Sequence, residues 1–234
     1  MNAFKLLMAA SCFLGLATSG VAKQDYSKSE GLLQYVDPYI GSGFHGHVFV
    51  GTSVPYGMVQ LGPNNIHKGW DWCSGYHESD STVIGFSHTH LEGTGIGDLF
   101  DVTVMPVTGD VTYARGEEGV PESGLWSYGA RSKEVSRPDY YAIPLLRYGI
   151  LAEMTATNRV GLHRYTFPKA HDAAIVFDLE NGGCWDSPVE TFMKADGDKR
   201  IVGYRHSTGW AKNQKVYFAA EFSKPFETLS LIHI

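Results

Sequence analysis

Apolar and polar residues alternate along much of the second half of this chain, and turn residues interrupt the runs at regular intervals. A period of two is typical of half-buried β-strands, and helical periodicity is scarce. Residues 173–179 are predominantly apolar, which predicts a central strand buried on both faces. Tyr148-Gly149-Ile150 predicts a hairpin turn. Further strands are predicted at residues 102–107, 161–167, 200–207 and 215–222. Together these strands indicate an all-β fold, a large antiparallel β-sandwich.

Residues 37–98 have a different character, because their strand signals are weak and their composition is unusual. Six of the ten histidines fall here, together with many of the 27 glycines. Two dense runs stand out, GWDWCSGYH at residues 69–77 and GFSHTHLEGTGIGD at residues 85–98. Glycine lets a backbone turn sharply and approach a ligand closely, and loops held on a rigid sheet often carry function. We therefore expect the binding surface in these loops.

The first 22 residues have the form of a secretory signal peptide. Lys5 provides the positive charge, residues 6–17 form a short apolar run, and small residues at 20–22 suit a cleavage point. That run is too short to span a bilayer, and no later segment predicts a membrane span. A lipoprotein with lipid on Cys12 is the alternative, but the apolar run continues beyond that residue. The sequence therefore predicts a secreted or periplasmic protein.

The mature chain, residues 23–234, has about 210 residues, which suits one large β-domain. A formal net charge of −6 offers no basic surface to nucleic acid. Two cysteines remain in it, Cys73 and Cys184, and an oxidising compartment permits a disulfide between them. The position of Cys73 inside the tryptophan run favours instead a free thiol that lines the site.

Aromatic and short polar side chains alternate in the run at residues 69–77. Trp70 and Trp72 would face the same way in an extended backbone, with Asp71 between them. Flat rings beside hydrogen-bonding groups suit a sugar, whose C–H face stacks on a ring while its hydroxyls bind polar edges. The alternatives are two core aromatics and a turn-capping aspartate. We favour a carbohydrate-binding surface, since Gly69, Asp71 and Cys73 would make burial of the whole segment costly.

Two histidine pairs follow an H-x-H pattern, His45 with His47 and His88 with His90. Such pairs occur in zinc hydrolases, where a third ligand completes the site, and Glu92 and Asp98 are candidates by proximity in the sequence. We prefer that the histidines hydrogen-bond loop backbone or sugar hydroxyls, because a short H-x-H match discriminates poorly.

Glycoside hydrolysis needs a pair of carboxyl groups around the scissile bond. Glu92, Asp98 and Asp101 are the acidic residues nearest the histidines in the sequence. Nothing in the sequence separates an acid from a base among them. We therefore assign no catalytic residue and no metal ligand in this chain.

The motifs together resemble glycoside hydrolase family 92, the exo-acting α-mannosidases of bacteria. The resemblance rests on DPYIG (37–41), HGH (45–47), VPYGMVQL (54–61), residues 69–80 and residues 84–98. Weaker matches follow at residues 136–138, 155–168, 203–205 and 222–226, in family order.

The resemblance implies the N-terminal domain of that family, a galactose-mutarotase-like supersandwich. The family's second domain, an (α/α)6 barrel, carries the acid and base carboxylates and most of the calcium site, and hydrolysis of the α-mannoside inverts the anomeric centre. Residues 229–234 depart from the family pattern and the barrel is missing, so we expect a C-terminally truncated fragment, inactive alone. Its sandwich would form one wall of a pocket for mannose-containing glycans, and Trp72 would stack on the sugar. The expected site residues are Gly46, His47, Trp70, Asp71, Trp72, Cys73, His88 and His90.

Two other functions compete with this interpretation. Exposed tryptophans would also suit a mannan-binding module that stands alone without catalysis, although half a pocket should hold a monosaccharide weakly. The H-x-H pairs leave open a zinc hydrolase, which stoichiometric zinc in the purified protein would support.

Overall fold

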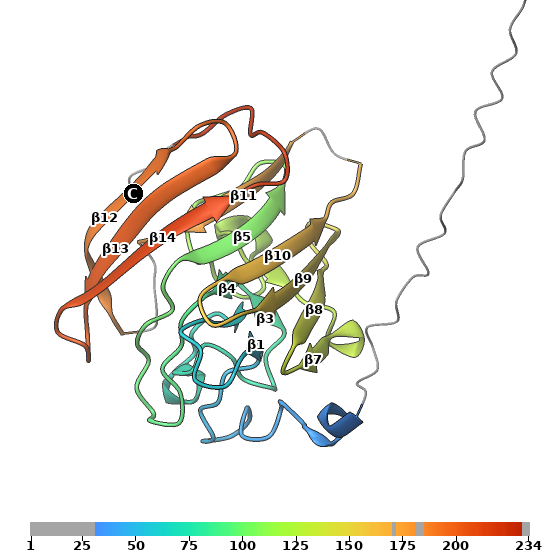
Figure 1. Ribbon diagram of the computed structural model, residues 1–234. Helices are drawn as coiled ribbons and strands as arrows, with labels where there is room; N and C mark the ends of the chain where they lie inside the picture. Colours follow the sequence, from blue (N-terminus) through green and yellow to red (C-terminus); the bar gives the residue numbers. More distant parts are fainter. Residues whose placement is uncertain (1–30, 170–171, 181–184, 231–234) are drawn as a thin grey trace, which may run out of the picture.

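The computed structural model describes residues 31–169, 172–180 and 185–230. The predicted signal peptide, Cys12 and Cys184 lie outside the described residues. Within those ranges the chain consists of antiparallel strands joined by loops, and its helical elements are short 3-10 turns (Figure 1). The all-β prediction is confirmed.

Five strands form the first sheet in the order β1-β2-β4-β5-β11. β5 (Thr103–Thr108) confirms the strand predicted at residues 102–107. β11 (Ala173–Asp178) pairs with β5 along its whole length, but it ends the sheet and its residues are exposed or half-buried. The prediction of a central strand at 173–179 is therefore wrong, because β5 covers only one of its two edges. The remaining strands are β1 (Thr52–Ser53), β2 (Gln60–Asn64) and β4 (Gly85–Ser87).

Four strands form the second sheet in the order β10-β9-β8-β7. β10 (Gly161–Thr166) confirms the alternating strand predicted at residues 161–167. The predicted hairpin is also present, since Leu145 pairs with Ile150 and Gly149 turns with a φ of 64°. The other strands are β7 (Val135–Arg137), β8 (Tyr140–Leu145) and β9 (Ile150–Ala156).

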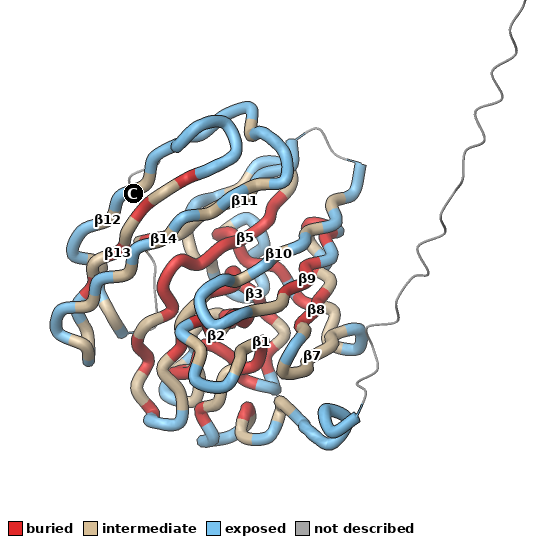
Figure 2. Tube along the Cα trace, in the orientation of Figure 1, coloured by how far each residue is buried: buried red, intermediate tan, exposed pale blue. Residues whose placement is uncertain are grey.

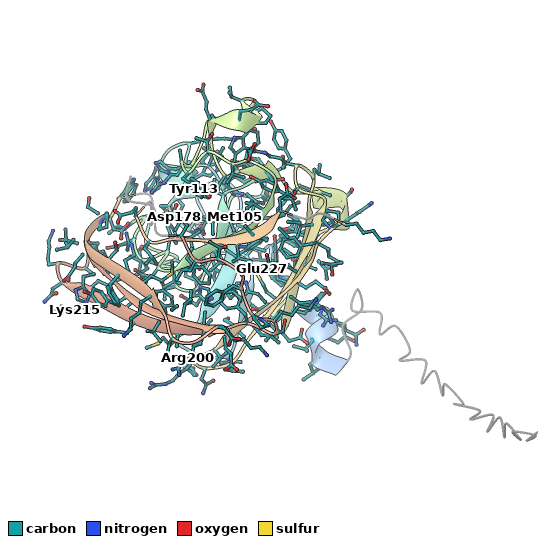
Figure 3. The ribbon with its side chains drawn as sticks, turned by 90° about the horizontal axis from the view of Figure 1, so that it is seen from above. Met105, Tyr113, Asp178, Arg200, Lys215 and Glu227 are labelled. Carbon is teal, nitrogen blue, oxygen red and sulfur yellow. The ribbon has the colours of Figure 1, made fainter. Side chains whose placement is uncertain are left out.

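The two sheets share one apolar core. Leu61, Phe86 and Met105 from the first sheet belong to the same buried cluster as Ile143 and Met154 from the second. Figure 2 shows the buried residues gathered where the strands of both sheets meet, and Met105 lies inside the molecule in the view from above (Figure 3). This shared core makes the chain a β-sandwich, as predicted.

A third sheet of three long strands flanks the first, in the order β12-β13-β14. β13 (Arg200–Thr208) and β14 (Gln214–Glu221) confirm the predicted pair, whereas β12 (Ser187–Ala195) was not predicted. Phe177 of β11 stacks on Phe218 of β14 with ring centroids 6.1 Å apart, which joins this sheet to the first. Arg200 and Lys215 lie at its outer side (Figure 3).

The tryptophan run is not extended, which corrects the prediction. Residues Trp70–Trp72 form a 3-10 turn, in which the Trp72 amide donates to Gly69 and the Cys73 amide donates to Trp70. With three residues per turn, side chains two positions apart point in different directions. The other short elements are the helices η1 (Gly31–Tyr35), η3 (Pro121–Ser123) and η4 (Arg131–Lys133), and the two-stranded sheet of β3 (Thr82–Val83) and β6 (Ser127–Tyr128).

Candidate carbohydrate-binding site

Three loops that are far apart in the sequence converge beside the sandwich. The Gly93 amide donates to the His47 carbonyl at 2.7 Å, and the indole Nε1 of Trp70 donates to the Gly95 carbonyl at 2.8 Å. The glycine-rich segment at 93–95 therefore ties the H-x-H loop to the tryptophan turn. The prediction that these motifs form one surface agrees with this arrangement.

The H-x-H loop at residues 45–47 depends on a glycine and on a strained histidine. A Cβ on Gly46 would lie 2.1 Å from the Gly41 carbonyl oxygen, so only glycine fits there. His47 holds a left-handed backbone with φ of 55°, which is uncommon for a residue with a side chain. Strain of this kind persists where the surroundings enforce it, often at functional sites. Here it accompanies an imidazole that is directed inward and is only 6% exposed.

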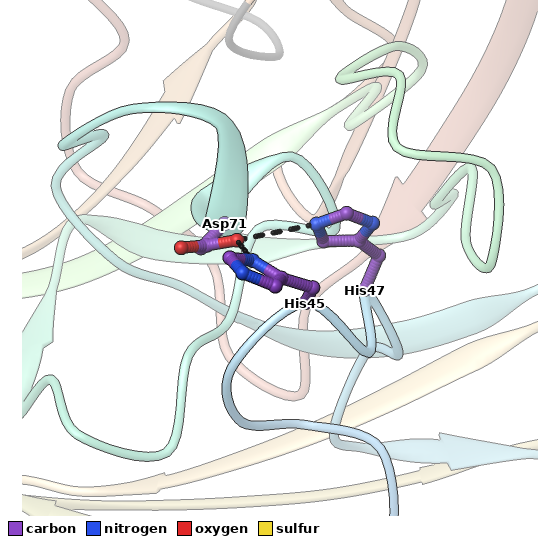
Figure 4. Close-up of side chains that lie close together, drawn as sticks. All are labelled: His45, His47 and Asp71. Carbon is purple, nitrogen blue, oxygen red and sulfur yellow. Dashed lines mark hydrogen bonds and ion pairs between the residues drawn. The ribbon is translucent and has the colours of Figure 1, made fainter.

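Asp71 faces the two imidazoles of that loop with one carboxylate oxygen (Figure 4). Its Oδ1 is 2.5 Å from Nδ1 of His45 and 3.5 Å from Nε2 of His47. The hydrogen bond from His45 lowers the pKa of the Asp71 carboxyl. Asp71 is therefore an anion that offers its oxygens at a half-exposed position.

Trp70 presents an accessible indole next to this polar cluster. The side chain is 53% exposed, although its Nε1 is fixed by Gly95. The His47 ring meets it edge-on at a centroid distance of 4.3 Å, and the His45 ring is tilted at 5.3 Å. A Cβ on Gly95 would lie 2.9 Å from Nε1 of Trp70, so this glycine also determines where the indole sits. The sequence analysis gave no role to Gly95, whose only signal is its place among closely spaced glycines.

Trp72 is held by the protein itself. Its ring stacks on His77 at 4.5 Å, and its Nε1 donates to Asp80 at 2.8 Å. The Lys68 ammonium lies 5.7 Å from the ring centroid and also pairs with Asp80 at 2.8 Å. Of the two predicted tryptophans, Trp70 is the one with a free surface.

Cys73 is a free thiol, as favoured by the sequence, but it is only 1% exposed. Burial raises the pKa of the thiol to about 11. The structure thus places Cys73 beneath the site and keeps it protonated at neutral pH.

His88 belongs to a chain of hydrogen bonds inside the sandwich. Its Nδ1 donates to the Val102 carbonyl at 2.8 Å, so its Nε2 accepts from Nε2 of His163 at 3.0 Å. Nδ1 of His163 in turn accepts from the Tyr165 hydroxyl at 2.7 Å. Burial lowers the pKa of His88 and takes that of His163 to about 3, which keeps both rings neutral. Both ring nitrogens of His88 are used by the protein.

His90 is buried as well. Its Nδ1 bonds the Gln60 carbonyl at 2.9 Å, its Nε2 lies 3.0 Å from the Ser87 hydroxyl, and the Phe49 ring stacks on it at 5.1 Å. Burial lowers the pKa of His90 to about 4. The two H-x-H pairs therefore differ: the first gathers around Asp71, and the second is part of the interior.

The three acidic residues considered in the sequence hold parts of the fold together. Glu92 accepts from the backbone of Phe49 and the side chain of Gln60, and burial raises its pKa. Asp98 accepts backbone amides at residues 99 and 211. Asp101 pairs with the buried Arg205 at 2.9 Å. The carboxylate beside a histidine pair is that of Asp71, whereas Glu92 and Asp98 were the candidates by proximity in the sequence.

An exposed ring beside fixed polar groups, carried on a β-sandwich, is the kind of surface found in carbohydrate-active proteins. The chain belongs to glycosyl hydrolase family 92, since the model of that family's N-terminal domain matches residues 35–233.

Relatives of known structure agree with this assignment. A family 92 α-mannosidase from Bacteroides thetaiotaomicron, solved alone and in complex with mannoimidazole, is 38% identical with a TM-score of 0.81 over 85% of this chain. An inverting family 92 mannosidase from the same organism, 23% identical over 84% of this chain with a TM-score of 0.67, shares the fold. An uncharacterized secreted glycosidase of Arthroderma benhamiae is 36% identical over 160 residues, 66% of this chain.

The chain spans only part of these proteins. It covers 26% of each of the two structures and 19% of the fungal glycosidase. Among the described residues, no helix is long and apolar enough to cross a membrane.

Proposed function

We propose that this domain forms one wall of the mannose pocket in an exported, calcium-dependent α-mannosidase that hydrolyses terminal α-mannosides with inversion. The observation that carries the proposal is Trp70, 53% exposed, beside His45, His47 and Asp71 on loops fixed by hydrogen bonds. A hexose can stack on the indole while its hydroxyls bond to the carboxylate and the imidazoles. Trp70 replaces Trp72 as the stacking residue, because the ring of Trp72 is already in contact with His77.

The residues of this chain would bind and orient the sugar. Asp71 can accept hydrogen bonds from two hydroxyls, and His47 holds a fixed orientation because its loop is tied to Gly93. The proton transfers need a carboxylic acid and a carboxylate base on opposite sides of the glycosidic bond. In the proposed enzyme both groups come from the second domain of the family.

A calcium ion needs a different set of ligands from those that the described residues of this chain offer. Calcium takes about six to eight oxygen ligands, whereas the potential metal-binding group among the described residues is His45, His47 and Asp71. Two imidazoles and one carboxylate do not fit this ion. We therefore place calcium in the second domain and derive no step from it.

Two further exposed side chains support a role at a domain junction. Phe44 and Tyr56 are 83% and 107% exposed, and both hold left-handed backbones, with φ of 48° and 61°. Aromatic side chains kept in solvent on a strained backbone suggest a surface that a second domain covers. Export is supported by the form of the signal peptide and by the secreted glycosidase among the relatives.

The test is to join this chain to a family 92 barrel and to measure mannose release from an α-mannoside. Trp70→Ala should lower kcat/KM by about tenfold or more, because loss of a stacked ring removes roughly 1–2 kcal/mol. Tyr217→Ala is the matched control, since Tyr217 is 67% exposed and its ring contacts Tyr204 and His206 within the third sheet. Equal activity of the Trp70 variant and the parent would refute the assignment.

The same exposed Trp70 supports a second candidate, a mannan-binding module that acts without catalysis. Titration calorimetry of the isolated chain with mannose and mannobiose separates the two. A half-pocket should bind no tighter than the millimolar range, whereas micromolar binding would favour the module.

A further inference from the structure

The group formed by His45, His47 and Asp71 has a property that sugar binding does not require. Each of the three residues offers a ligand atom, and these atoms all lie within 4.8 Å of one another. In Figure 4 both imidazoles point toward the same carboxylate oxygen. Two imidazoles and one carboxylate that converge in this way are the donor set of many transition-metal sites.

The buried imidazole of His47 is a second, independent observation. Its side chain is 5% exposed, and its Nε2 is a buried atom with no hydrogen-bond partner among the described residues. Buried polar atoms are nearly always hydrogen-bonded, so such an atom needs an explanation. The Asp71 oxygen at 3.5 Å is too distant for a good hydrogen bond. A buried ring nitrogen without a hydrogen-bond partner, directed at Asp71 from the interior, is available as a metal ligand.

We propose that His45, His47 and Asp71 bind a divalent transition-metal ion of the zinc class. Imidazole and carboxylate bind zinc at about 2.0–2.2 Å, so ligand atoms of a tetrahedral site lie about 3.3 Å apart. The Nε2 of His47 and the Oδ1 of Asp71 are 3.5 Å apart, close to that spacing. Three protein ligands leave the fourth position open for water or another oxygen.

His45 has to move away from Asp71 for the site to hold zinc. The 2.5 Å contact between His45 and Asp71 is hydrogen-bond length, shorter than the spacing around zinc. The His45 side chain is 71% exposed, which leaves it room to move outward. His47, the buried ligand, is already in place, and the tight turn at Gly46 keeps both rings on the same loop.

The location of the site gives the metal a role in the proposed function. Trp70 lies 4.3 Å from the His47 ring and 5.3 Å from the His45 ring, measured between centroids. An ion held by these rings would lie next to the proposed sugar platform. Zinc bound there should change the affinity of the site for a glycan. This effect on affinity rests on the proposed function, whereas the binding of zinc itself does not.

The experiment is a calorimetric titration of the purified full chain with zinc chloride, after removal of any polyhistidine tag and treatment with a chelator. We expect one equivalent of zinc to bind with saturation, and binding to weaken on acidification because protons compete for the imidazoles. Cobalt(II) should give the visible absorption of a tetrahedral site when it replaces zinc. Asp71→Asn and His45→Ala should each weaken binding at least tenfold, and both side chains are accessible enough for the fold to survive.

His206→Ala is the matched control. His206 also lies next to a carboxylate, with its Nδ1 3.4 Å from Glu190, but it belongs to no three-ligand group in the described part of the chain. The control should leave zinc affinity unchanged. Absence of saturable binding, or equal loss in all three variants with unchanged circular dichroism, would overturn the proposal. Because no glycan is present, either result leaves the test of the mannose pocket untouched.

Discussion

At the scale of single residues, Trp70 and Trp72 show that two residues of the same type in one motif can have different roles. Trp72 is held by His77 and Asp80, and Trp70 by a single backbone carbonyl at Gly95. The contacts of Trp72 are local in the sequence, whereas Gly95 lies 25 positions from Trp70. Residue type alone could not say which of the two rings would remain accessible.

Gly95 offers a direct test of how Trp70 is positioned. Gly95→Ala should lower kcat/KM of the barrel-joined enzyme by about tenfold, because the new Cβ would lie 2.9 Å from the indole Nε1 and displace it. Gly93→Ala is the matched control, since Gly93 has a φ of 71° against 70° for Gly95 but no atom within 4 Å of a Cβ. Both variants carry the same backbone strain. Equal losses in the two variants would mean that strain, and not the indole, sets activity.

At the scale of elements, the alternation of apolar and polar residues predicted the strands whose two faces differ in burial. It failed for strands that lack this difference. β10 and the β13–β14 pair were found because one face of each strand is more buried than the other. The predominantly apolar run at 173–179 was placed in the middle of a sheet, whereas β11 lies at the end of its sheet and packs Phe177 against Phe218. Short strands such as β4 (Gly85–Ser87) give too few residues for a period to emerge.

The candidate site could be predicted only in part, because the sequence shows the residue types but not the contacts that folding creates. Glycine, histidine and tryptophan in loops indicated where a ligand surface would lie. The pairing of Asp71 with His45 spans 26 positions, and only the folded sheet brings them together. His88 and His90 carry the same H-x-H pattern, but they directly follow β4, where backbone carbonyls, Ser87 and His163 use their nitrogens.

Arg205 on β13 joins the third sheet to the first. Its fully buried guanidinium pairs with Asp101 at 2.9 Å, before β5, and with Asp186 at 2.5 Å, before β12. Arg205→Ala should lower the free energy of unfolding by about 3–5 kcal/mol, because two carboxylates lose their buried cation. Arg200→Ala, on the same strand, removes an exposed pair with Asp196 and should cost about 1 kcal/mol or less. Urea denaturation of both variants measures the difference.

The pH dependence of the Arg205 variant provides a further check. Burial already raises the pKa of Asp101 with the guanidinium beside it, and removal of the cation should raise that pKa further. An acid whose pKa is higher in the folded state binds protons preferentially there, so acidification stabilises the fold. The deficit of the variant relative to the parent should therefore shrink as the pH falls from neutral toward the raised pKa. A deficit independent of pH would show that unpaired carboxylates are not its cause.

At the scale of the whole molecule, the site rests on the body of the sandwich. Cys73 follows the tryptophan turn directly and is 1% exposed, and Tyr76 three residues later belongs to the core shared by both sheets. The turn should therefore open only when the sandwich opens. A platform built this way is rigid without a ligand, which would limit the ordering cost of the proposed sugar binding.

The thiol of Cys73 reports on that rigidity. In residues 23–234 carrying Cys184→Ser, Cys73 is the only cysteine, and burial raises its pKa to about 11. Reaction with a disulfide reagent at pH 8 should be more than about a thousandfold slower than for an exposed thiol, because a marginally stable domain opens globally less often than that. The exposed position 132 provides the reference, as Ser132→Cys with both native cysteines replaced by serine. Urea should raise the rate at Cys73 in parallel with unfolding. A rapid reaction without denaturant would instead show that the turn holding Trp70 opens locally, and the sugar platform would then have to be ordered by its ligand or by the second domain.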